Sequence, residues 1–364
     1  SGFTSTGFTI FNDLDKLDQT LILWRSSSQW IGGLYFLFSI LLLIDLFDEN
    51  LKRSLTNYIS LNSSEIFKQV FKIIVIYLSM TILIFVLLKL VNLRSYDAYN
   101  FALTLISSGG FLPNDNFDST FTTDISKIIL SISMLFSFFS LFFIFNLIFF
   151  KKKNINYLSE DINILIYLLI VIILSFIFFN YDNNFLNILV SISSSVSNIG
   201  ISFEQVPKNL VFVFLILVIL GGSFFSTSSG LRVIKVLTLI KFSLNNLLSH
   251  SKPNQIYSNK LSLNKISANI NDINKYFFAI IIFILSLFLV SALLTISNLD
   301  FESSFKLGIL TIMNTVNSEM YDLATLDFYN FNIFSKISLI IFMIIGRIEL
   351  LSVIILLKKF LFKS

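Results

Sequence analysis

Five stretches of the chain, each about 20 residues long, carry no charged side chain. They are residues 26–44, 128–150, 162–181, 209–231 and 276–299. A hydrocarbon layer about 30 Å thick is crossed by about 20 apolar residues in helical conformation. Two further stretches, 70–91 and 337–357, are as long but contain a few charged residues. The sequence therefore predicts seven membrane-spanning helices.

The composition points to the same class of protein. Hydrophobic residues make up 55% of the 364 residues and charged residues only 13%, whereas a soluble domain carries about 25% charged residues. Proline and glycine are scarce, so most of the chain should be helical. These features predict an all-α polytopic membrane protein.

Several functions lack the residues that they would need. The chain has no cysteine and a single histidine, His250, so disulfides and thiolate metal sites are excluded. It also lacks the sequence motifs of hydrolytic and redox enzymes, and we expect no enzymatic activity and no organic cofactor. A net charge of +4 is too small to indicate nucleic-acid binding.

The basic residues predict an orientation in the membrane. Segments 45–68, 151–161, 232–275 and 358–363 together hold 16 Lys and Arg residues. Segments 1–25, 89–127, 182–208 and 300–336 hold 8. Because cytoplasmic loops of membrane proteins are enriched in Lys and Arg, the first set should face the cytoplasm.

The outer segments share a repeated design. Three of these segments each contain one predicted short helix, followed by small polar residues at a turn. The predicted helices are residues 95–106, 184–195 and 302–315. The turns read SSGGF (107–111), SNIGI (197–201) and NSEMY (317–321), and the chain opens with a similar TSTGF (4–8). In this register the key positions are Gly7, Gly110, Gly200 and Met320.

Such loops between spanning helices predict re-entrant pore loops, because non-helical backbone at membrane depth must be buried or line a wet cavity. Rings of carbonyl groups at such loops replace the hydration shell of a cation. The predicted fold is therefore helix–pore loop–helix units repeated around one central cation pore. The alternative is a set of ordinary polar turns that cap short helices. The candidate ion ligands are Ser5, Thr6, Gly7, Ser108, Gly109, Gly110, Asn198, Ile199, Gly200, Ser318, Glu319 and Met320.

Six motifs, taken in order, resemble one family. They are TSTGFTIFNDL, LILWRSSSQWIGGL, LISSGGF, SSSVSNIGIS, GGSFFSTSSGLRVIKVLTLIK (221–241) and MIIGRIELLSVIIL (343–356). This series is similar to the Trk/Ktr/HKT superfamily of potassium transporters, and most of all to the bacterial Trk-type membrane subunit.

The resemblance implies a pore domain of four pseudo-repeats that carries K⁺ across the bacterial cytoplasmic (inner) membrane, in contact with lipid. It also implies a homodimer and a cytosolic nucleotide-binding ring that regulates it. Members of the family carry further N-terminal helices, so we expect this chain to be truncated within its first repeat. The expected repeats in this single pore domain are residues 1–49, 50–153, 154–250 and 251–364.

The predicted span 209–231 contains an unusual interruption. Gly221, Gly222 and Gly230 flank residues 223–229, which include several hydroxyl side chains. The resemblance implies an intramembrane gating loop below the filter. Phe224 and Phe225 stand where the family usually has small residues. They make either a tighter hydrophobic gate or packing that faces lipid.

Arg347 lies deep in the last predicted span. A central arginine costs about 2.5–3.5 kcal/mol on insertion scales, and such residues usually face a cavity or a partner. Glu349 lies two residues on, and residues at that spacing do not share a helix face. The resemblance implies that Arg347 stands beside the pore, holds the gating loop and repels cations. Arg232 is expected to be an anchor at the membrane interface.

The predicted function is uptake of a monovalent cation, K⁺, and two alternatives stay open. The fourth turn has Met320 where the other three have glycine, and an L-residue at positive φ costs about 1–2 kcal/mol. A weakly selective or Na⁺-conducting relative is therefore one alternative. Together with Phe224 and Phe225, the same residue leaves open a non-conducting membrane subunit with an assembly or regulatory role.

Overall fold

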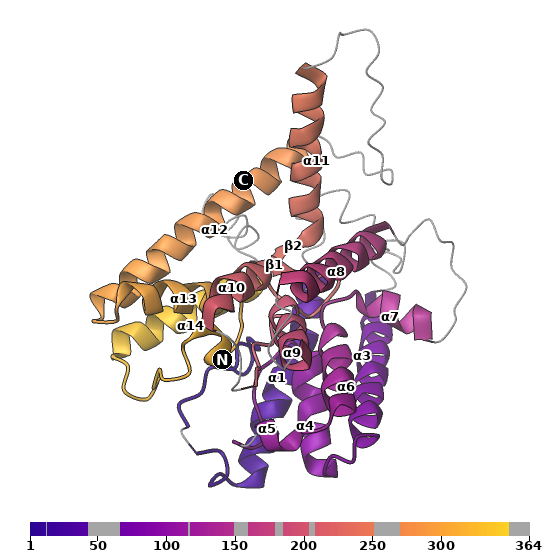
Figure 1. The fold of residues 1–364 in the computed structure, drawn as a ribbon, viewed down its shortest axis with the longest axis vertical. Helices are drawn as coiled ribbons and strands as arrows, with labels where there is room; N and C mark the ends of the chain where they lie inside the picture. Colours follow the sequence, from indigo (N-terminus) through magenta and orange to yellow (C-terminus); the bar gives the residue numbers. More distant parts are fainter. Residues whose placement is uncertain are drawn as a thin grey trace.

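The computed structural model describes residues 1–348 apart from 12, 43–65, 116, 149–158, 179–184, 204–207 and 251–269. Nearly all the regular structure in this part of the chain is helical (Figure 1).

The first helices are α1 (Gln19–Leu42), α3 (Ile66–Lys89) and α4 (Ser95–Ile106). The short helix α4 has the predicted bounds, and it packs against both α1 and α3. Residues 98 and 100–106 of α4 are buried, as expected of a re-entrant helix that is enclosed by longer ones.

The next elements are α5 (Phe117–Thr120), α6 (Asp124–Leu135) and α7 (Leu141–Ile148). A single helix over 128–150 was predicted, and this prediction is wrong. The carbonyl oxygens of Ser137 and Phe138 accept hydrogen bonds from Ser228 N and Ser223 N, at 3.1 and 2.9 Å. In turn, Leu141 N donates to Phe225 O at 3.1 Å. Contacts with a distant loop thus replace the helical hydrogen bonds at this point.

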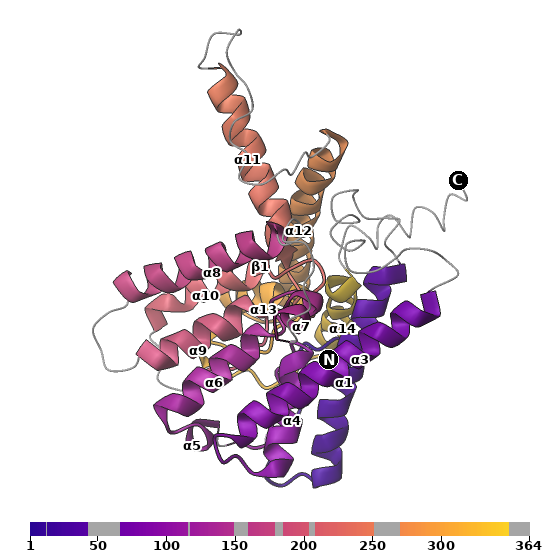
Figure 2. The ribbon, with the colours of Figure 1, turned by 90° about the vertical axis from the view of Figure 1, so that its right-hand side faces the viewer.

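The third quarter contains α8 (Ser159–Phe178), α9 (Phe185–Val196), the 3₁₀ helix η4 (Lys208–Leu210) and α10 (Val211–Ile219). After α10 come two short parallel strands, β1 (Leu220–Gly221) and β2 (Leu231–Arg232), and then α11 (Val233–His250). In the pairing, Leu220 lies opposite Leu231 and Gly221 opposite Arg232. The predicted interruption of this span is confirmed. Figures 1 and 2 both show α11 extending away from the other helices.

The last elements are α12 (Ile270–Ile296), α13 (Phe301–Ile312), the 3₁₀ helix η5 (Glu319–Tyr321) and α14 (Ile333–Ile348). The side chain of Asp300 caps α13 by accepting a hydrogen bond from Ser303 N at 2.9 Å. Helix α12 packs along α13 and also contacts α14. The predicted span 337–357 begins inside α14 and continues beyond the described residues.

Two helices of the described part are long and apolar enough on their own to cross a membrane. They are Phe67–Lys89 and Ile273–Ile296, within α3 and α12. Two shorter apolar helices, Ile162–Phe176 and Phe185–Val196, lie in α8 and α9. The other predicted spans are interrupted, less apolar or only partly described.

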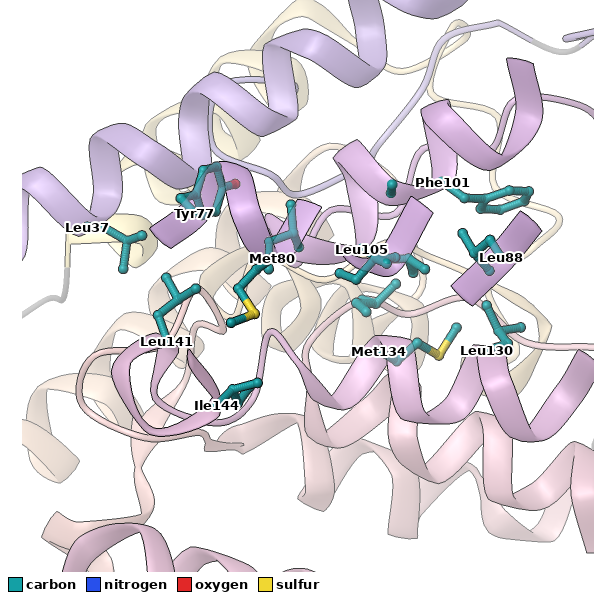
Figure 3. Close-up of a cluster of buried hydrophobic side chains, with 14 of the residues drawn as sticks. Leu37, Tyr77, Met80, Leu88, Phe101, Leu105, Leu130, Met134, Leu141 and Ile144 are labelled. Carbon is teal, nitrogen blue, oxygen red and sulfur yellow. The ribbon is translucent and has the colours of Figure 1, made fainter. Parts of the chain in front are cut away.

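The buried side chains form two main clusters. The first joins α1, α3, α4, α6 and α7, and Figure 3 shows side chains from each of these helices, including Leu37, Tyr77, Leu105, Met134 and Leu141. The second joins α9, α10, α12, α13 and α14. The turn that follows α9 supplies Ile199 and Ile201 to the first cluster, and the segment that follows α13 supplies Val316 to the first and Met313 to the second.

Candidate ion pathway

Four turns carry the same backbone signature. Ser5, Ser108, Asn198 and Asn314 adopt left-handed φ values of 53°, 58°, 59° and 50°. In the last three turns this residue stands two positions after the end of α4, α9 or α13. Small polar residues, asparagine above all, tolerate this conformation because the short side chain can hydrogen-bond locally. The structure therefore repeats one turn four times.

The predicted register of the fourth turn is wrong. The residue with left-handed φ is Asn314, so the position that corresponds to Gly7, Gly110 and Gly200 is Val316. Met320 lies four residues further on, in η5, and is not among the residues with positive φ.

The cause lies in where α13 ends. The helix stops at Ile312, three residues before the predicted end, so the turn begins earlier. The Met320 side chain is buried in the second cluster, with its sulfur 3.6 Å from Ser195 Oγ. Glu319 is exposed. Residues 318–320 therefore do not take the place in the fourth turn that the sequence assigned to them.

The first three turns are in direct contact. A Cβ placed on Gly7 would lie 3.2 Å from the Cα of Gly110, so the first and second turns approach each other at their glycines. The hydroxyl of Ser108 donates a hydrogen bond to the carbonyl oxygen of Ser197. The second turn is thereby joined to the third.

The fourth turn joins the third turn to the first. Asn198 Nδ2 donates to Thr315 Oγ1 at 3.3 Å, across the third and fourth turns. Asn314 Nδ2 donates to Thr6 Oγ1 at 3.0 Å, across the fourth and first turns. The four turns thus form a closed ring in which each contacts the next in chain order.

A cavity of about 450 Å³ opens against one side of this ring. Gly7, Gly110 and Val316 line it, together with the carboxylate residues Asp115 and Asp327. Both carboxylates also accept hydrogen bonds from backbone N–H groups. Asp115 Oδ2 accepts from Leu14 N at 2.8 Å, and Asp327 Oδ1 accepts from Tyr329 N at 2.9 Å. The cavity is therefore a partly acidic vestibule above the ring.

Arg25 also lines this vestibule, and the sequence did not single it out. Its side chain is buried, Nη2 donates to Thr9 Oγ1 at 3.2 Å, and the guanidinium lies 4.3 Å from the centroid of the Phe111 ring. In the sequence, Arg25 directly precedes a predicted span, which suggests a residue at the membrane interface. No neighbouring residue indicates that it lines this vestibule.

Arg347 lies on the opposite side of the ring from the vestibule, among the first two turns and the interrupted helix. Its Nη2 donates to Ser5 Oγ at 3.3 Å and to Ser107 O at 3.2 Å, and its Nη1 donates to Ser229 Oγ at 3.0 Å. The guanidinium also lies 4.5 Å from the centroid of the Phe36 ring. The side chain is buried, and it ties the ring to the loop after β1. Glu349 lies outside the described residues.

The interruption between β1 and β2 forms a loop of residues 222–230, here called the crossing loop, and residues 222–229 of it are buried. Arg232, in β2, holds this loop: its Nη1 donates to Ser223 O at 2.9 Å, to Ser228 O at 3.0 Å and to Ser226 Oγ at 3.2 Å. The predicted role of Arg232 as an interfacial anchor is therefore wrong, because only 5% of its surface is exposed.

The crossing loop also contacts the ring. Thr227 Oγ1 donates to the carbonyl oxygen of Ile106, the last residue of α4, at 2.7 Å. Ser229 Oγ lies 3.4 Å from Asn314 Oδ1 in the fourth turn. The loop thus bridges the end of α4, which leads into the second turn, and the fourth turn.

Phe224 and Phe225 do not face lipid. Their surfaces are 2% and 3% exposed, which excludes one of the two interpretations of these rings. The Phe225 ring stacks on Phe142 of α7, with 4.9 Å between the centroids. The crossing loop therefore packs against the break between α6 and α7 through both backbone hydrogen bonds and ring stacking.

The geometry can be compared with that of known proteins. No family model matches the chain. The crystal structure of the potassium transporter TrkH from Vibrio parahaemolyticus matches the fold with a TM-score of 0.80. The match covers 98% of this chain and 76% of that chain, at 21% identity.

Relatives of known sequence match over the same extent. The Trk system potassium uptake protein TrkH of Escherichia coli is 24% identical over 378 residues, which cover 98% of this chain and 76% of the relative. TrkG of Escherichia coli is 24% identical over 393 residues, covering 100% and 78%. The chain is a homologue of the Trk-type proteins. An uncharacterised cation transporter of Methanocaldococcus jannaschii is also similar, at 26% identity over 382 residues, covering 100% of this chain and 75% of the relative.

These matches confirm the resemblance to the Trk-type proteins that the motifs indicated. They also confirm the predicted fold class, because the matching fold is that of a polytopic membrane protein. The Trk-type homology extends over the ring, the crossing loop and α14, since the alignments cover nearly all of the chain.

Proposed function

We propose that this chain carries K⁺ inward across a bacterial cytoplasmic membrane, through the ring formed by its four turns. The observation that supports the proposal most strongly is the closure of the ring: each turn contacts the next in chain order. A closed ring of left-handed turns presents backbone carbonyl and hydroxyl oxygens, which can replace the hydration shell of a monovalent cation.

The proposed ion-binding residues follow the register of the structure. In each turn they are the left-handed residue and the residue after it, followed in the first three turns by a glycine. The set is Ser5, Thr6, Gly7, Ser108, Gly109, Gly110, Asn198, Ile199, Gly200, Asn314 and Thr315.

The names of the relatives support the choice of ion. Those of Escherichia coli are potassium uptake proteins, and that of Methanocaldococcus jannaschii is a cation transporter. Under this proposal the chain performs no covalent catalysis and needs no organic cofactor. It forms a single pore domain of four repeats, bounded near residues 49, 153 and 250.

We also propose that the crossing loop is the gate. It contacts the last residue of α4 and the fourth turn, and it is held by Arg347 and Arg232. A homodimer and a cytosolic nucleotide-binding ring remain proposals that rest on the family resemblance. Such a partner would act on the pore by moving the crossing loop.

Uptake of radioactive Rb⁺ tests the proposal in cells that lack their own K⁺ uptake. The full-length protein should carry Rb⁺, and Thr315→Val should weaken discrimination against Na⁺, because it removes the hydroxyl that joins the third and fourth turns. Thr311→Val is the matched control: Thr311 is buried on α13, and its hydroxyl donates at 2.6 Å to Leu307 O of the same helix.

Discrimination should be unchanged in the control. The chain is a non-conducting subunit if the wild-type protein reaches the membrane but carries no Rb⁺, and if no variant of the ring carries Rb⁺ either. Equal loss of discrimination in both variants would show that the ring is not the selective element.

A further inference from the structure

The side chain of Val316 occupies the space that the three glycines leave open. A Cβ placed on Gly7 would lie 3.0 Å from Val316 Cβ, and a Cβ on Gly110 would lie 2.6 Å from the same atom. A Cβ on Gly200 would lie 2.8 Å from Val316 Cγ1. One isopropyl group therefore faces all three of the other turns at the same level of the ring.

The backbone of the fourth turn explains why a valine is tolerated there. Gly7 and Gly200 have φ values of +85° and +87°, which L-residues rarely adopt, whereas Val316 has no positive φ. A β-branched residue can therefore occupy this position without backbone strain. The turn keeps its left-handed residue two positions earlier, at Asn314.

The valine is also held in place. Val316 N donates to the carbonyl oxygen of Ile199 at 3.4 Å. Asn314 fixes the start of the turn through bonds to Thr6 Oγ1 at 3.0 Å and to Met343 O at 2.8 Å. A β-branched side chain has few χ1 rotamers, so a held backbone leaves the isopropyl group little freedom to move away from the three glycines.

An apolar group at this level cannot replace the hydration of a cation. Methyl groups offer no oxygen ligand, and a narrow hydrophobic constriction in a pore closes by losing its water. Gly7, Gly110 and Val316 form the side of the ring that lines the vestibule, so the isopropyl group stands between the vestibule and the rest of the ring. The side chain is 9% exposed.

We propose that Val316 is a hydrophobic plug at the vestibule end of the filter, which keeps the resting ring from holding a cation at that level. This inference rests on the proposed function, because a plug matters only in a conducting ring. It makes withdrawal of the Val316 side chain a step in every passage of an ion.

The test compares Val316→Gly, Val316→Ala and Val316→Leu in the full-length protein. The readouts are Rb⁺ uptake in cells and equilibrium binding of radioactive Rb⁺ to the purified protein. Val316→Gly should raise uptake by about tenfold, which corresponds to ~1.4 kcal/mol off the barrier, and should increase the amount of Rb⁺ bound. Val316→Ala should give a smaller rise, and Val316→Leu should lower both quantities.

Val290→Ala is the control for loss of a buried valine, since Val290 is fully buried on α12 within the second cluster. It should leave Rb⁺ uptake and Rb⁺ binding per folded molecule unchanged. Should Val316→Gly fail to fold, Val316→Ala and Val316→Leu still give opposite predicted changes.

The outcomes separate the plug from the proposed function. Uptake and binding that are the same in the wild type and in all three Val316 variants would overturn the plug and leave the proposed function standing. Rb⁺ uptake by Val316→Gly together with none by the wild type would support both. If none of the folded variants binds or carries Rb⁺, the proposed function fails and the plug with it.

Discussion

The third and fourth turns begin alike and end differently. Each follows a helix of 12 residues, and each starts with an asparagine in the left-handed conformation. Two residues later, the third turn has Gly200 at a φ of +87°, whereas the fourth has Val316 without a positive φ. A glycine is therefore required in one turn by backbone conformation and by space together. In the fourth turn the backbone at this position does not need a positive φ, so a valine can stand there, and its side chain fills the ring.

Placing a side chain in the third turn should have the largest effect. In Gly200→Ala the new Cβ would lie 2.5 Å from Val316 O, and the left-handed conformation costs an L-residue about 1–2 kcal/mol. Uptake of Rb⁺ should fall by more than about tenfold, the equivalent of ~1.4 kcal/mol, and the thermal unfolding temperature of the purified protein should fall as well.

The matched control is Gly308→Ala, within α13. There a new Cβ would lie 3.1 Å from Ser291 Oγ and 3.3 Å from Leu287 Cδ1, which are side-chain atoms that can shift. Alanine is also favoured over glycine in a helix by about 1 kcal/mol. If Gly200→Ala were tolerated as well as Gly308→Ala, the two turns would not differ in their need for glycine.

Removing the charge below the ring should have the next largest effect. Arg347 bonds directly to Ser5 of the first turn and Ser107 of the second, and Ser229 links it to Asn314 of the fourth. Arg347→Gln should raise basal Rb⁺ uptake by about fivefold. The substitution removes ~1 kcal/mol of hydrogen bonding that holds the crossing loop, and it removes a positive charge that repels the cation. Normal amounts of protein in the membrane with unchanged uptake would show that Arg347 is structural only.

Cutting the link to the fourth turn alone should have a smaller effect. Ser229→Ala removes the hydroxyl between Arg347 and Asn314, and basal uptake should rise by about twofold to threefold, because one net hydrogen bond of ~0.5 kcal/mol is lost. Ser338→Ala on α14 is the control, since the Ser338 side chain is buried and its hydroxyl donates at 2.9 Å to Phe334 O of the same helix. Equal effects of the two substitutions would show that the rise does not come from the link between Arg347 and Asn314.

The smallest effect is expected at the residue that the sequence had placed in the fourth turn. Met320→Leu keeps the volume of a buried side chain in the second cluster, and such exchanges usually cost less than about 1.5 kcal/mol. Competition of Na⁺ against Rb⁺ uptake should be the same as in the wild type. A change in selectivity here, with none at Val316, would restore the register inferred from the sequence.

Much of the fold could be predicted because its signals are local. Uncharged apolar stretches indicated the membrane, the short helix at 95–106 has its predicted bounds, and glycines marked the first three turns. The hydroxyl residues between Gly222 and Gly230 also indicated the interruption that the structure shows.

The missed features depend on contacts between distant parts of the chain. The fourth turn has no glycine, so its register depended on spacing. The available signal was Asn314, which repeats the place of Asn198 after its helix. The interruption between α6 and α7 has neither glycine nor proline, and arises from hydrogen bonds to the crossing loop, more than 80 positions away from Ser137. Arg232 looked like an interfacial residue because its partners are carbonyl groups of a folded loop.

The most direct test of the ring is the location of Tl⁺, a heavy substitute for K⁺, by anomalous scattering from crystals of the protein. We expect a peak enclosed by Ser5, Ser108, Asn198 and Asn314, with none at the level of Val316 and an added peak at that level in Val316→Gly. A strongest peak beside Glu319 in η5, or no peak within the four turns, would contradict the account.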